Sequence, residues 1–245
     1  MHLEKIELND FIIKGRLPYE NRKFFSQHLA PYVFLKQLLK SKQKYILEIG
    51  IGEGFGLYYL SEIAEKIFGL DMDLKCYDFL KEYKNKIKKD NIEFINADAV
   101  YLPFKDNTFS AVITCQVIEH ILPLHLVDFL KEIKRVVIPK GIILISTLNL
   151  THNVKDPLKY EKYAPHHKEF DYYELEKLLK EVFDNFIILG LNLTLKHRFF
   201  QRLKKWGLEN TKPVKNFYNR INTSDFVVSK VDYKKSLDLF VVCYK

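Results

Sequence analysis

The stretch that decides the fold is "EIGIGEGFG", residues 48–56, in which four glycines occupy every second position. It follows the apolar run "YIL" of residues 45–47, which has the length and character of a buried strand. Glycine adds no side-chain packing and costs conformational entropy on folding. A run of glycines directly after a strand therefore predicts a turn whose backbone must come close to a ligand or to another part of the chain.

Strand and helix patterns alternate on both sides of this turn, from about residue 31 to residue 190. After the turn, apolar residues continue at helical spacing through Leu57, Leu60, Ala64 and Ile67. Strands are expected at 45–49, 66–71, 91–98, 109–115, 141–149, 186–193 and 236–245. The alternation predicts an α/β fold with a doubly wound, mostly parallel sheet.

The chain shows no internal repeat, no low-complexity linker and no clear domain break. Residues 1–43 are expected to form a helical, aromatic-rich leader or lid, and residues 44–245 the main domain. Residues 194–235 form a basic insert before the last strand. The leader aromatics that could wall a lid, or pack as one face of a helix, are Tyr19, Phe24, Phe25, Tyr32 and Phe34.

Composition limits the classes of protein and partner. Hydrophobic residues make up 47% of the 245, so a sizeable core can form. Lys and Arg number 39 against 31 Asp and Glu, giving a net charge of +8 that suits RNA or an anionic membrane surface. A Lys-rich solvated surface has the same composition. Three cysteines without metal-ligand spacing indicate no metal site and a reducing cytoplasm, and no apolar run is long enough for a membrane span.

Three ligand classes use a glycine turn between a strand and a helix. A P-loop requires Gly-Lys-Ser/Thr after the glycines, and this chain has "GFGLYY" instead. A dinucleotide fingerprint requires a third glycine where Phe55 stands. The third class is the one whose turn has the pattern found here, Glu48-x-Gly50-x-Gly52-x-Gly54. In such a turn the backbone N–H groups and the start of the helix face the ligand.

Further segments follow this pattern in a fixed order. The second strand ends in "GLDMD", whose Asp71 could accept two hydrogen bonds from ribose hydroxyls, although Asp71 alone would fit NAD equally well. Next come "NADAVYLPFKDNTFSAVI" (96–113), "CQVIEHI" (115–121), "EIKRVVIPKGIILISTLN" (132–149) and "HHKEFDYYELEKLL" (166–179). Asp171 with Glu174 in the last segment predicts a capping box that opens a helix.

Together these segments, over about residues 20–190, resemble the class I S-adenosylmethionine (SAM) dependent methyltransferases, in particular the small-molecule branch called methyltransferase type 11. The resemblance implies a seven-stranded Rossmann-like sheet of order 3-2-1-4-5-7-6 with the last strand antiparallel. It also implies SAM as the cofactor and S-adenosylhomocysteine as its product. Lys140 departs from the family by replacing the first glycine of a Gly-Gly pair.

The resemblance also implies a set of cofactor-binding residues. They are Glu48, Gly50, Gly52, Gly54, Asp71, Met72, Asp98, Ala99, Cys115 and Gln116. The glycines would lie against the methionine part and ribose, Asp71 would bind the ribose, and Asp98 with the Ala99 N–H would meet the adenine. Glu48 ends a buried strand, where an unpaired charge is costly, so it either meets the cofactor or holds the turn.

Three histidines are candidates for contact with the methyl acceptor. His166 aligns with a histidine of the family and is the candidate general base for a hydroxyl acceptor. His28 and His120 are further substrate candidates, His28 because "SQHLAPY" resembles a leader motif in which Pro31 here replaces Arg. A structural role is the alternative for each of them.

The expected function is methyl transfer from SAM to an O, N or C atom of a small-molecule, glycan, lipid or quinone acceptor. One alternative is a tRNA or rRNA methyltransferase that uses the basic, aromatic residues 196–220 to grip RNA. Another is a catalytically silent SAM-binding protein. The sequence leaves the acceptor open.

Overall fold

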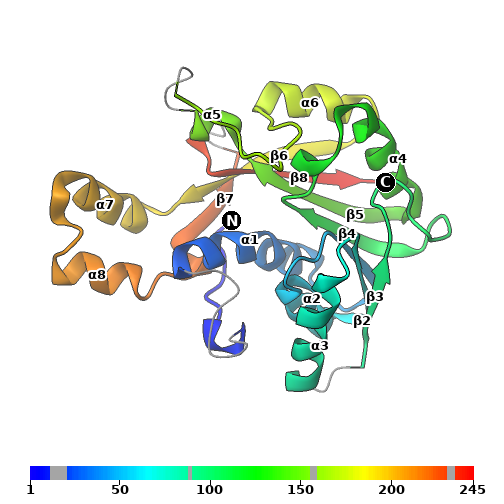
Figure 1. The fold of residues 1–245 in the computed structure, drawn as a ribbon, viewed down its shortest axis with the longest axis horizontal. Coiled ribbons are helices and arrows are strands. Elements are labelled where there is room, and N and C mark those ends of the chain that lie inside the picture. Colours follow the sequence, from blue (N-terminus) through cyan, green and yellow to red (C-terminus); the bar gives the residue numbers. More distant parts are fainter. Residues whose placement is uncertain (12–20, 88–89, 155–158, 231–234) are drawn as a thin grey trace.

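The computed structural model describes residues 1–11, 21–87, 90–154, 159–230 and 235–245. Within them, eight strands form one sheet in the order β3-β2-β1-β4-β5-β8-β6-β7 (Figure 1). The strands are β1 (Gln43–Ile49), β2 (Ala64–Asp71), β3 (Ile92–Asn96), β4 (Phe109–Cys115), β5 (Val137–Leu148), β6 (Phe186–Leu193), β7 (Phe226–Ser229) and β8 (Asp238–Tyr244). Strands β1 to β5 pair in parallel, whereas β8 is antiparallel to both β5 and β6.

Helices cover both faces of this sheet. The α-helices are α1 (Arg22–Leu39), α2 (Phe55–Leu60), α3 (Lys75–Ile87), α4 (Leu126–Val136), α5 (Leu150–Asn153), α6 (Tyr172–Lys180), α7 (Leu195–Leu203) and α8 (Lys212–Tyr218). Short helical turns are η1 (Leu8–Phe11), η2 (Ser61–Ile63), η3 (Ile118–His120), η4 (Pro123–His125), η5 (Lys204–Leu208) and η6 (Thr223–Asp225). One hydrophobic cluster joins α1, α2 and α3 to the sheet, and a second joins α4 and α6 to its other face. Figure 1 shows these two groups of helices on opposite sides of the sheet.

The expected strand order is confirmed, with one addition. β8 occupies the place of the seventh strand between β5 and β6, and it is antiparallel as expected. The eighth strand, β7, lies inside the region expected to be only a basic insert, and it adds an edge next to β6. Its four residues are too few to give a clear alternating pattern.

One expected helix is much shorter than its sequence pattern suggests. α2 ends at Leu60, and Ala64 and Ile67 belong to β2 instead of continuing the helix. All these positions are buried because both elements pack into the same core, so apolar spacing alone did not separate them. The expected capping box is confirmed: Asp171 Oδ1 accepts from the Glu174 N–H at 2.8 Å, and Glu174 reaches back to the Asp171 N–H.

The leader of residues 1–43 does not stand apart from the domain. α1 begins at its cap Asn21, and its residues Phe25, Leu29 and Val33 are fully buried in the core. Before η1, His2 forms an isolated β-bridge with Val227, and Ile6 exchanges hydrogen bonds with the Asn222 side chain. Of the leader aromatics, Tyr19 lies outside the described residues, Phe24 is exposed, and Phe25, Tyr32 and Phe34 are buried.

The insert 194–235 contains a helical hairpin that projects beyond β6 and β7, at the left of Figure 1. The hairpin consists of α7, η5 and α8. Its base is fixed because the buried His197 ring packs edge-on against Phe217 and Phe226. Thr194 caps α7 by accepting from the His197 N–H.

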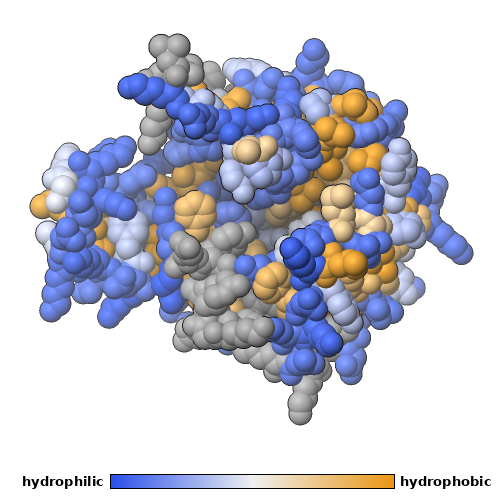
Figure 2. All heavy atoms as spheres, in the orientation of Figure 1, coloured by the Kyte–Doolittle hydropathy of each residue, from blue (hydrophilic) through white to orange (hydrophobic). Residues whose placement is uncertain are grey.

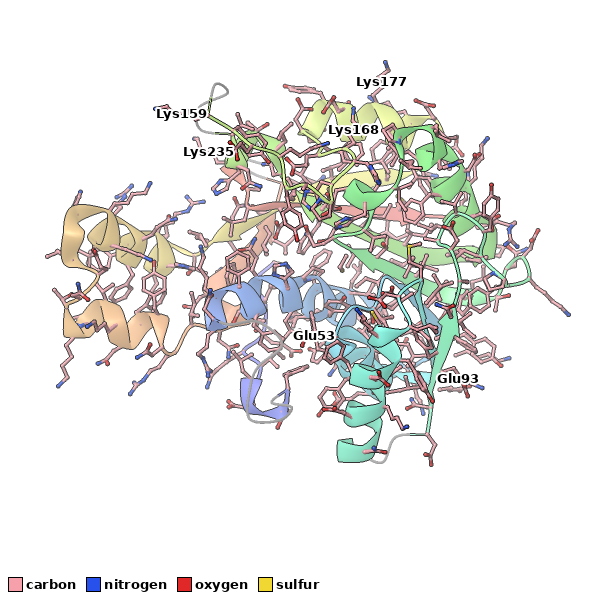
Figure 3. All side chains as sticks on the ribbon, in the orientation of Figure 1. Glu53, Glu93, Lys159, Lys168, Lys177 and Lys235 are labelled. Carbon is pink, nitrogen blue, oxygen red and sulfur yellow. The ribbon has the colours of Figure 1, made fainter. Side chains whose placement is uncertain are left out.

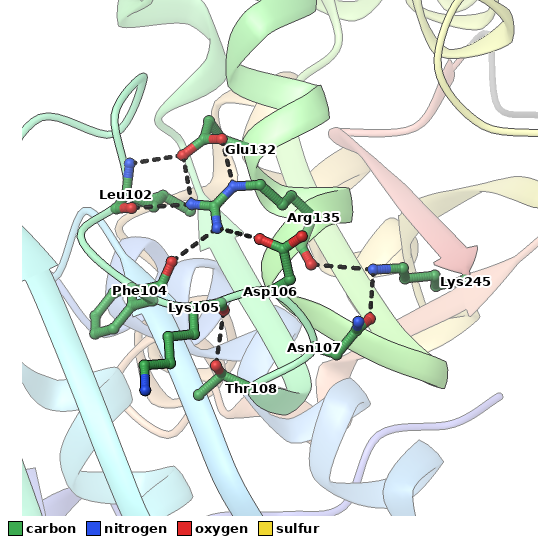
Figure 4. A network of polar contacts seen from close by, with 9 residues as sticks. All are labelled: Leu102, Phe104, Lys105, Asp106, Asn107, Thr108, Glu132, Arg135 and Lys245. Carbon is green, nitrogen blue, oxygen red and sulfur yellow. Dashed lines mark hydrogen bonds and ion pairs between the residues drawn. The ribbon is translucent and has the colours of Figure 1, made fainter.

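A polar network holds the loop after β3 against α4 (Figure 4). The Arg135 guanidinium donates to the carbonyl oxygens of Leu102 at 3.0 Å and Phe104 at 2.7 Å, and it pairs with Glu132 and Asp106. Glu132 in turn accepts from the Leu102 N–H at 2.9 Å. The loop between β3 and β4 is therefore fixed to α4, the helix that follows β4 in the chain.

In the part of the chain that the structure describes, no helix combines the length and apolar character needed to cross a membrane.

Candidate active site

A cavity of about 330 Å³ opens at the carboxyl ends of β1, β2 and β4. Ligands bind at this edge in open α/β sheets because the strand order reverses there. The lining residues are His28, Tyr32, Ile49, Gly50, Ile51, Gly52, Glu53, Phe55, Leu70, Asp71, Met72, Ala97, Asp98, Ala99, Cys115, Gln116, Val117, His120 and Ile121. They include eight of the ten residues expected to bind a cofactor; Glu48 and Gly54 lie outside the lining.

The four glycines of the turn meet different surroundings. Gly50, Gly52 and Gly54 all have positive φ angles, which favour glycine. A Cβ on Gly50 would lie 2.2 Å from Val117 Cγ2, and one on Gly56 would lie 2.6 Å from Glu48 Oε1, so both positions are closely packed against the protein. A Cβ on Gly52 would meet no atom within 4 Å. Gly52 is therefore the glycine that leaves space open at the cavity; Glu53, labelled in Figure 3, follows it.

Asp71 ends β2 and faces the glycine turn. Its Oδ2 accepts from the Gly52 N–H at 3.2 Å, and its Oδ1 accepts from the Asp73 N–H at 2.9 Å. Met72, the next residue, is 77% exposed although it lines the cavity. Each carboxylate oxygen keeps lone pairs beyond these single bonds, so Asp71 can accept further hydrogen bonds from a ligand.

Asp98 and Ala99 lie in the loop after β3, which the Arg135 network holds. The Asp98 side chain accepts from the Val100 N–H at 2.9 Å and thereby shapes the turn. Both residues line the cavity, so Asp98 can shape this turn and still be reached by a ligand.

The end of β4 brings Cys115 and Gln116 to the cavity. Gln116 has φ of +55°, which is uncommon for a residue other than glycine, and its N–H donates to Ser146 O at 2.8 Å. Strained backbone of this kind persists only where its surroundings hold it, and it clusters at functional sites.

Beneath the turn, Glu48 and Tyr32 form a buried pair. The Tyr32 hydroxyl donates to Glu48 Oε1 at 2.6 Å, and both side chains are almost fully buried. Burial raises the pKa of Glu48 to about 8, so it is mostly protonated at neutral pH. Its Oε2 is buried and, among the described residues, has no hydrogen-bond partner. Tyr32 reaches the cavity itself and is a site residue that the sequence indicated only as an aromatic of the leader; a Cβ on Gly56 would lie 2.1 Å from its ring, so Tyr32 packs directly on the turn.

His28 also reaches the cavity, from the first half of α1. Its Nδ1 lies 2.9 Å from Phe24 O, and its ring stacks on the exposed Phe24 ring. Burial lowers the pKa of His28, so the ring is neutral at pH 7.

His120 and His166 meet edge to face, with ring centroids 4.8 Å apart, but they occupy different positions. His120 lines the cavity, and its Nδ1 lies 3.1 Å from Pro165 O. Among the described residues that line the cavity, His120 is present and His166 is not. The His166 side chain is only 12% exposed and packs against the His120 ring. His166 Nδ1 lies 2.6 Å from Glu169 Oε1, and Tyr160 donates to the other oxygen of Glu169.

The contact with Pro165 fixes the proton position of the His120 ring. Because Pro165 O only accepts, His120 carries its proton on Nδ1 and keeps Nε2 as a proton acceptor. Burial is the main cause that lowers the pKa of His120, and the neighbouring His166 and His167 lower it further. A neutral imidazole with a free acceptor nitrogen at a cavity wall can act as a general base.

Glu119, the residue before His120, holds the surrounding loops together. Its backbone oxygen accepts from the N–H groups of His167 and Lys168, and its Oε2 accepts from Thr147 Oγ1 at 3.0 Å. Burial raises the pKa of Glu119 to about 7. Glu119 therefore joins η3, β5 and the 166–170 loop, which explains its place next to a cavity residue.

Residues 47–145 match the family described as "Methyltransferase domain". A probable S-adenosylmethionine-dependent methyltransferase of Mycolicibacterium smegmatis is 28% identical over 130 residues, 53% of this chain and 47% of that protein. A fatty-acid O-methyltransferase of the same species is 31% identical over 46% of this chain and 40% of its own. The ribosomal RNA small subunit methyltransferase G of Fusobacterium nucleatum is 34% identical over 33% of this chain and 35% of its own. The matched region thus spans about half the length, or less, of these relatives.

Solved structures share the fold at low identity. The YcgJ protein of Bacillus subtilis has a TM-score of 0.59 at 14% identity, covering 89% of this chain and 99% of its own. The phosphoethanolamine N-methyltransferase 2 of Haemonchus contortus, solved in complex with S-adenosyl-L-methionine, has a TM-score of 0.59 at 17% identity, covering 89% of this chain and 52% of its own.

Proposed function

The chain belongs to the class I SAM-dependent methyltransferases, and from that premise we propose that it transfers the methyl group of SAM to an acceptor bound in the cavity. The observation that carries the proposal is the pairing of Gly52 with Asp71. The glycine leaves open space at the cavity, and the carboxylate faces that space from the next strand.

The residues of the cavity fit SAM on three grounds. The space at Gly52 admits close approach of a ligand to the backbone. Asp71 supplies the acceptor oxygens that ribose hydroxyls need. The lining combines apolar side chains such as Ile51 and Leu70 with a few polar groups, as in other small-ligand sites.

We assign the parts of the cofactor to the residues as follows. Asp71 holds the ribose, with Met72 beside it. Asp98 and the Ala99 N–H hold the adenine. The turn of residues 50–54 holds the methionine part, and the backbone at Cys115 and Gln116 closes the opposite side. Glu48 supports the turn from below through its bond with Tyr32.

Bound SAM would supply an activated methyl group with its own leaving group. The residues of this chain hold the acceptor in line with that group and exclude water, which can contribute several kcal/mol without acid–base chemistry. For a hydroxyl acceptor, a base must also take up a proton. His166 was the candidate from the sequence, and we propose that His120 does this at the cavity wall while His166 and Glu169 position it.

The acceptor is a small molecule or a lipid in this proposal. A fatty-acid O-methyltransferase among the relatives and the apolar part of the lining support it. The second candidate is RNA, supported by the ribosomal RNA methyltransferase among the relatives and by the basic residues of the 194–235 insert. The three cysteines are free and apart from one another, which supports a reducing compartment such as the cytoplasm.

Calorimetry with S-adenosylhomocysteine tests the cofactor assignment. We expect the wild type to bind it, and Asp71→Ala to weaken binding by about 1.5–3 kcal/mol, because charged hydrogen bonds to the ribose are lost. Glu93→Ala, which changes an exposed carboxylate of β3 that pairs with Lys66, is the control and should leave the affinity unchanged. Binding of NADH without binding of S-adenosylhomocysteine would overturn the proposal.

Tritiated methyl transfer from SAM to separated small-molecule, lipid and RNA fractions then identifies the acceptor class. Label in the RNA fraction alone would favour the second candidate. Cofactor binding without label in any fraction would indicate a silent SAM-binding protein.

A further inference from the structure

The hairpin carries an exposed apolar stripe along α7 and η5. Leu195 is 83% exposed, Phe199 is 56% exposed and Trp206 is 72% exposed. Leu195 and Phe199 stand four residues apart in α7, a spacing that places them on one side of the helix, and the exposed Trp206 follows in η5. In Figure 2 the hairpin at the left is mainly hydrophilic, with hydrophobic atoms at its outer edge.

The opposite side of α7 already holds the hairpin on the domain. His197 is fully buried, and the Phe200 ring stacks on Phe217 with centroids 4.3 Å apart. The exposed stripe is therefore not needed to fix the hairpin. Exposed large apolar side chains gathered on one face commonly mark a surface for interaction.

Cations line one edge of this stripe. Three cations are exposed here: Arg198, Arg202 and Lys205. Arg198 follows Leu195 by three residues and Arg202 follows Phe199 by three, which makes the members of each pair neighbours on the helix surface. Lys205 follows Arg202 by three residues. The exposed stripe and the cations beside it together form the outer face of the hairpin, which consists of Leu195, Arg198, Phe199, Arg202, Lys205 and Trp206.

We propose that the outer face docks the protein on an anionic lipid surface. Leucine, phenylalanine and tryptophan beside arginine and lysine are the composition of helices that lie in the membrane interface. The apolar side chains enter the boundary between head groups and acyl chains, and the cations meet anionic head groups. RNA fits less well, because bases stack on aromatic rings within a groove that tracks the backbone, whereas this stripe projects outward and includes the aliphatic Leu195.

A second exposed aromatic ring lies beside the cavity itself: Phe24 of α1 is 53% exposed and stacks on His28, which lines the cavity. The binding itself does not depend on methyl transfer.

Tryptophan fluorescence tests the proposal directly, because Trp206 is the single tryptophan of the chain. The whole protein is titrated with vesicles of phosphatidylcholine mixed with phosphatidylglycerol, and with vesicles of phosphatidylcholine alone. We expect a shift of the emission to shorter wavelength and quenching by brominated lipid with the anionic vesicles only. Added salt should weaken the binding because it screens the head-group charge.

Two variants separate the charged and apolar contributions. Arg198→Glu/Arg202→Glu/Lys205→Glu should weaken vesicle binding by about 100-fold or more, because each cation near the surface contributes on the order of 1 kcal/mol. The control Lys42→Glu/Lys105→Glu/Lys131→Glu changes the net charge equally at exposed sites outside the hairpin, and should bind nearly as the wild type does. Leu195→Ser/Phe199→Ser should also weaken binding, whereas Tyr101→Ser/Leu124→Ser, at equally exposed sites, should not.

Several results would overturn the proposal. They are no emission shift with anionic vesicles, an equal shift with neutral vesicles, and equal weakening by the hairpin and control variants. Transfer RNA is added as a competitor in the same assay. A shift with transfer RNA that exceeds the shift with anionic vesicles would also overturn it, and would assign the outer face to RNA.

Discussion

At the scale of single residues, the glycine turn separates two functions that its sequence presents together. Gly50 and Gly52 both have positive φ, so alanine at either position carries the same conformational cost of about 1–2 kcal/mol. Only at Gly50 does the added Cβ strike the protein, at 2.2 Å from Val117 Cγ2. The pair therefore distinguishes a glycine required for packing from one required for a ligand.

We expect Gly50→Ala to destabilise the fold by about 2 kcal/mol more than Gly52→Ala, because overpacking adds to the backbone cost. Gly52→Ala should instead weaken the affinity for S-adenosylhomocysteine at least tenfold, because its Cβ takes up space at the cavity. Urea unfolding measures the first effect and calorimetry the second. If Gly52→Ala binds as tightly as the wild type, the open space at Gly52 is not used by the cofactor.

The two histidines can be ranked by their effects on turnover. If His120 is the base, its neutral form is active, so the rate rises with pH through its lowered pKa and then levels off. His120→Ala should reduce turnover about 100-fold or more while cofactor affinity stays within a few-fold. His166→Ala should reduce turnover less. It should also shift the rise in rate to higher pH, because His166 lowers the pKa of His120 and its removal raises that pKa.

The opposite ranking would return the role of base to His166, as the sequence suggested. A loss of folded protein without loss of turnover per folded molecule would make both histidines structural. Thermal unfolding of each variant separates these outcomes.

At the scale of elements, Arg135 couples α4 to the loop that carries Asp98 and Ala99. We expect Arg135→Ala to destabilise the protein by about 2–4 kcal/mol, because one side chain donates to two backbone oxygens and pairs with two carboxylates. Arg135→Lys should recover only part of this, since an ammonium cannot form the forked contacts. Lys131→Ala, an exposed change on the same helix, is the control for urea unfolding. A loss of similar size in both variants would contradict the coupling.

The elements also show how far sequence reasoning reached. The positions of the strands followed from apolar runs, their order in the sheet followed from the family resemblance, and the Asp171–Glu174 capping box followed from local chemistry. The end of α2 and the strand β7 did not, because burial in a shared core hides the change from helix to strand, and four residues give too short a pattern.

Within the site, the sequence candidates for cofactor binding that line the cavity lie at or just after the ends of strands, and their contact with a cofactor stays a prediction. Asp71, Asp98 and Cys115 all reach the cavity because of this position. Tyr32 was missed because its position depends on how α1 packs over the turn, which no local pattern encodes. The order of His120 and His166 around the cavity likewise depends on the path of a loop fixed by Glu119.

At the scale of the whole molecule, three buried carboxyl groups make folding depend on pH. Burial raises the pKa of Glu48 to about 8 and that of Glu119 to about 7. It also raises the pKa of Asp238 to about 7, although a hydrogen bond from Gln27 opposes the shift. In the unfolded chain these groups ionise near pH 4–4.5, so above that range the folded protein holds more protons than the unfolded one.

Stability must then fall as pH rises, because the slope of the unfolding free energy follows the protons bound by the unfolded state minus those bound by the folded state. Buried histidines oppose this below about pH 6.5. Burial lowers the pKa of His197 to about 4, so there the unfolded chain binds a proton that the folded chain does not. Between pH 6.5 and 8 the carboxyl groups act without that opposition.

We therefore expect the free energy of unfolding to decrease by on the order of 2 kcal/mol between pH 6.5 and pH 8. Glu48→Gln should flatten this slope, because an amide keeps the neutral hydrogen bond with Tyr32 and does not ionise. Glu181→Gln, at an exposed site, should leave the slope as it is. Urea unfolding at several pH values measures all three proteins, and an equal slope in the Glu48 variant would mean that the folded protein ionises Glu48 as readily as the unfolded chain does.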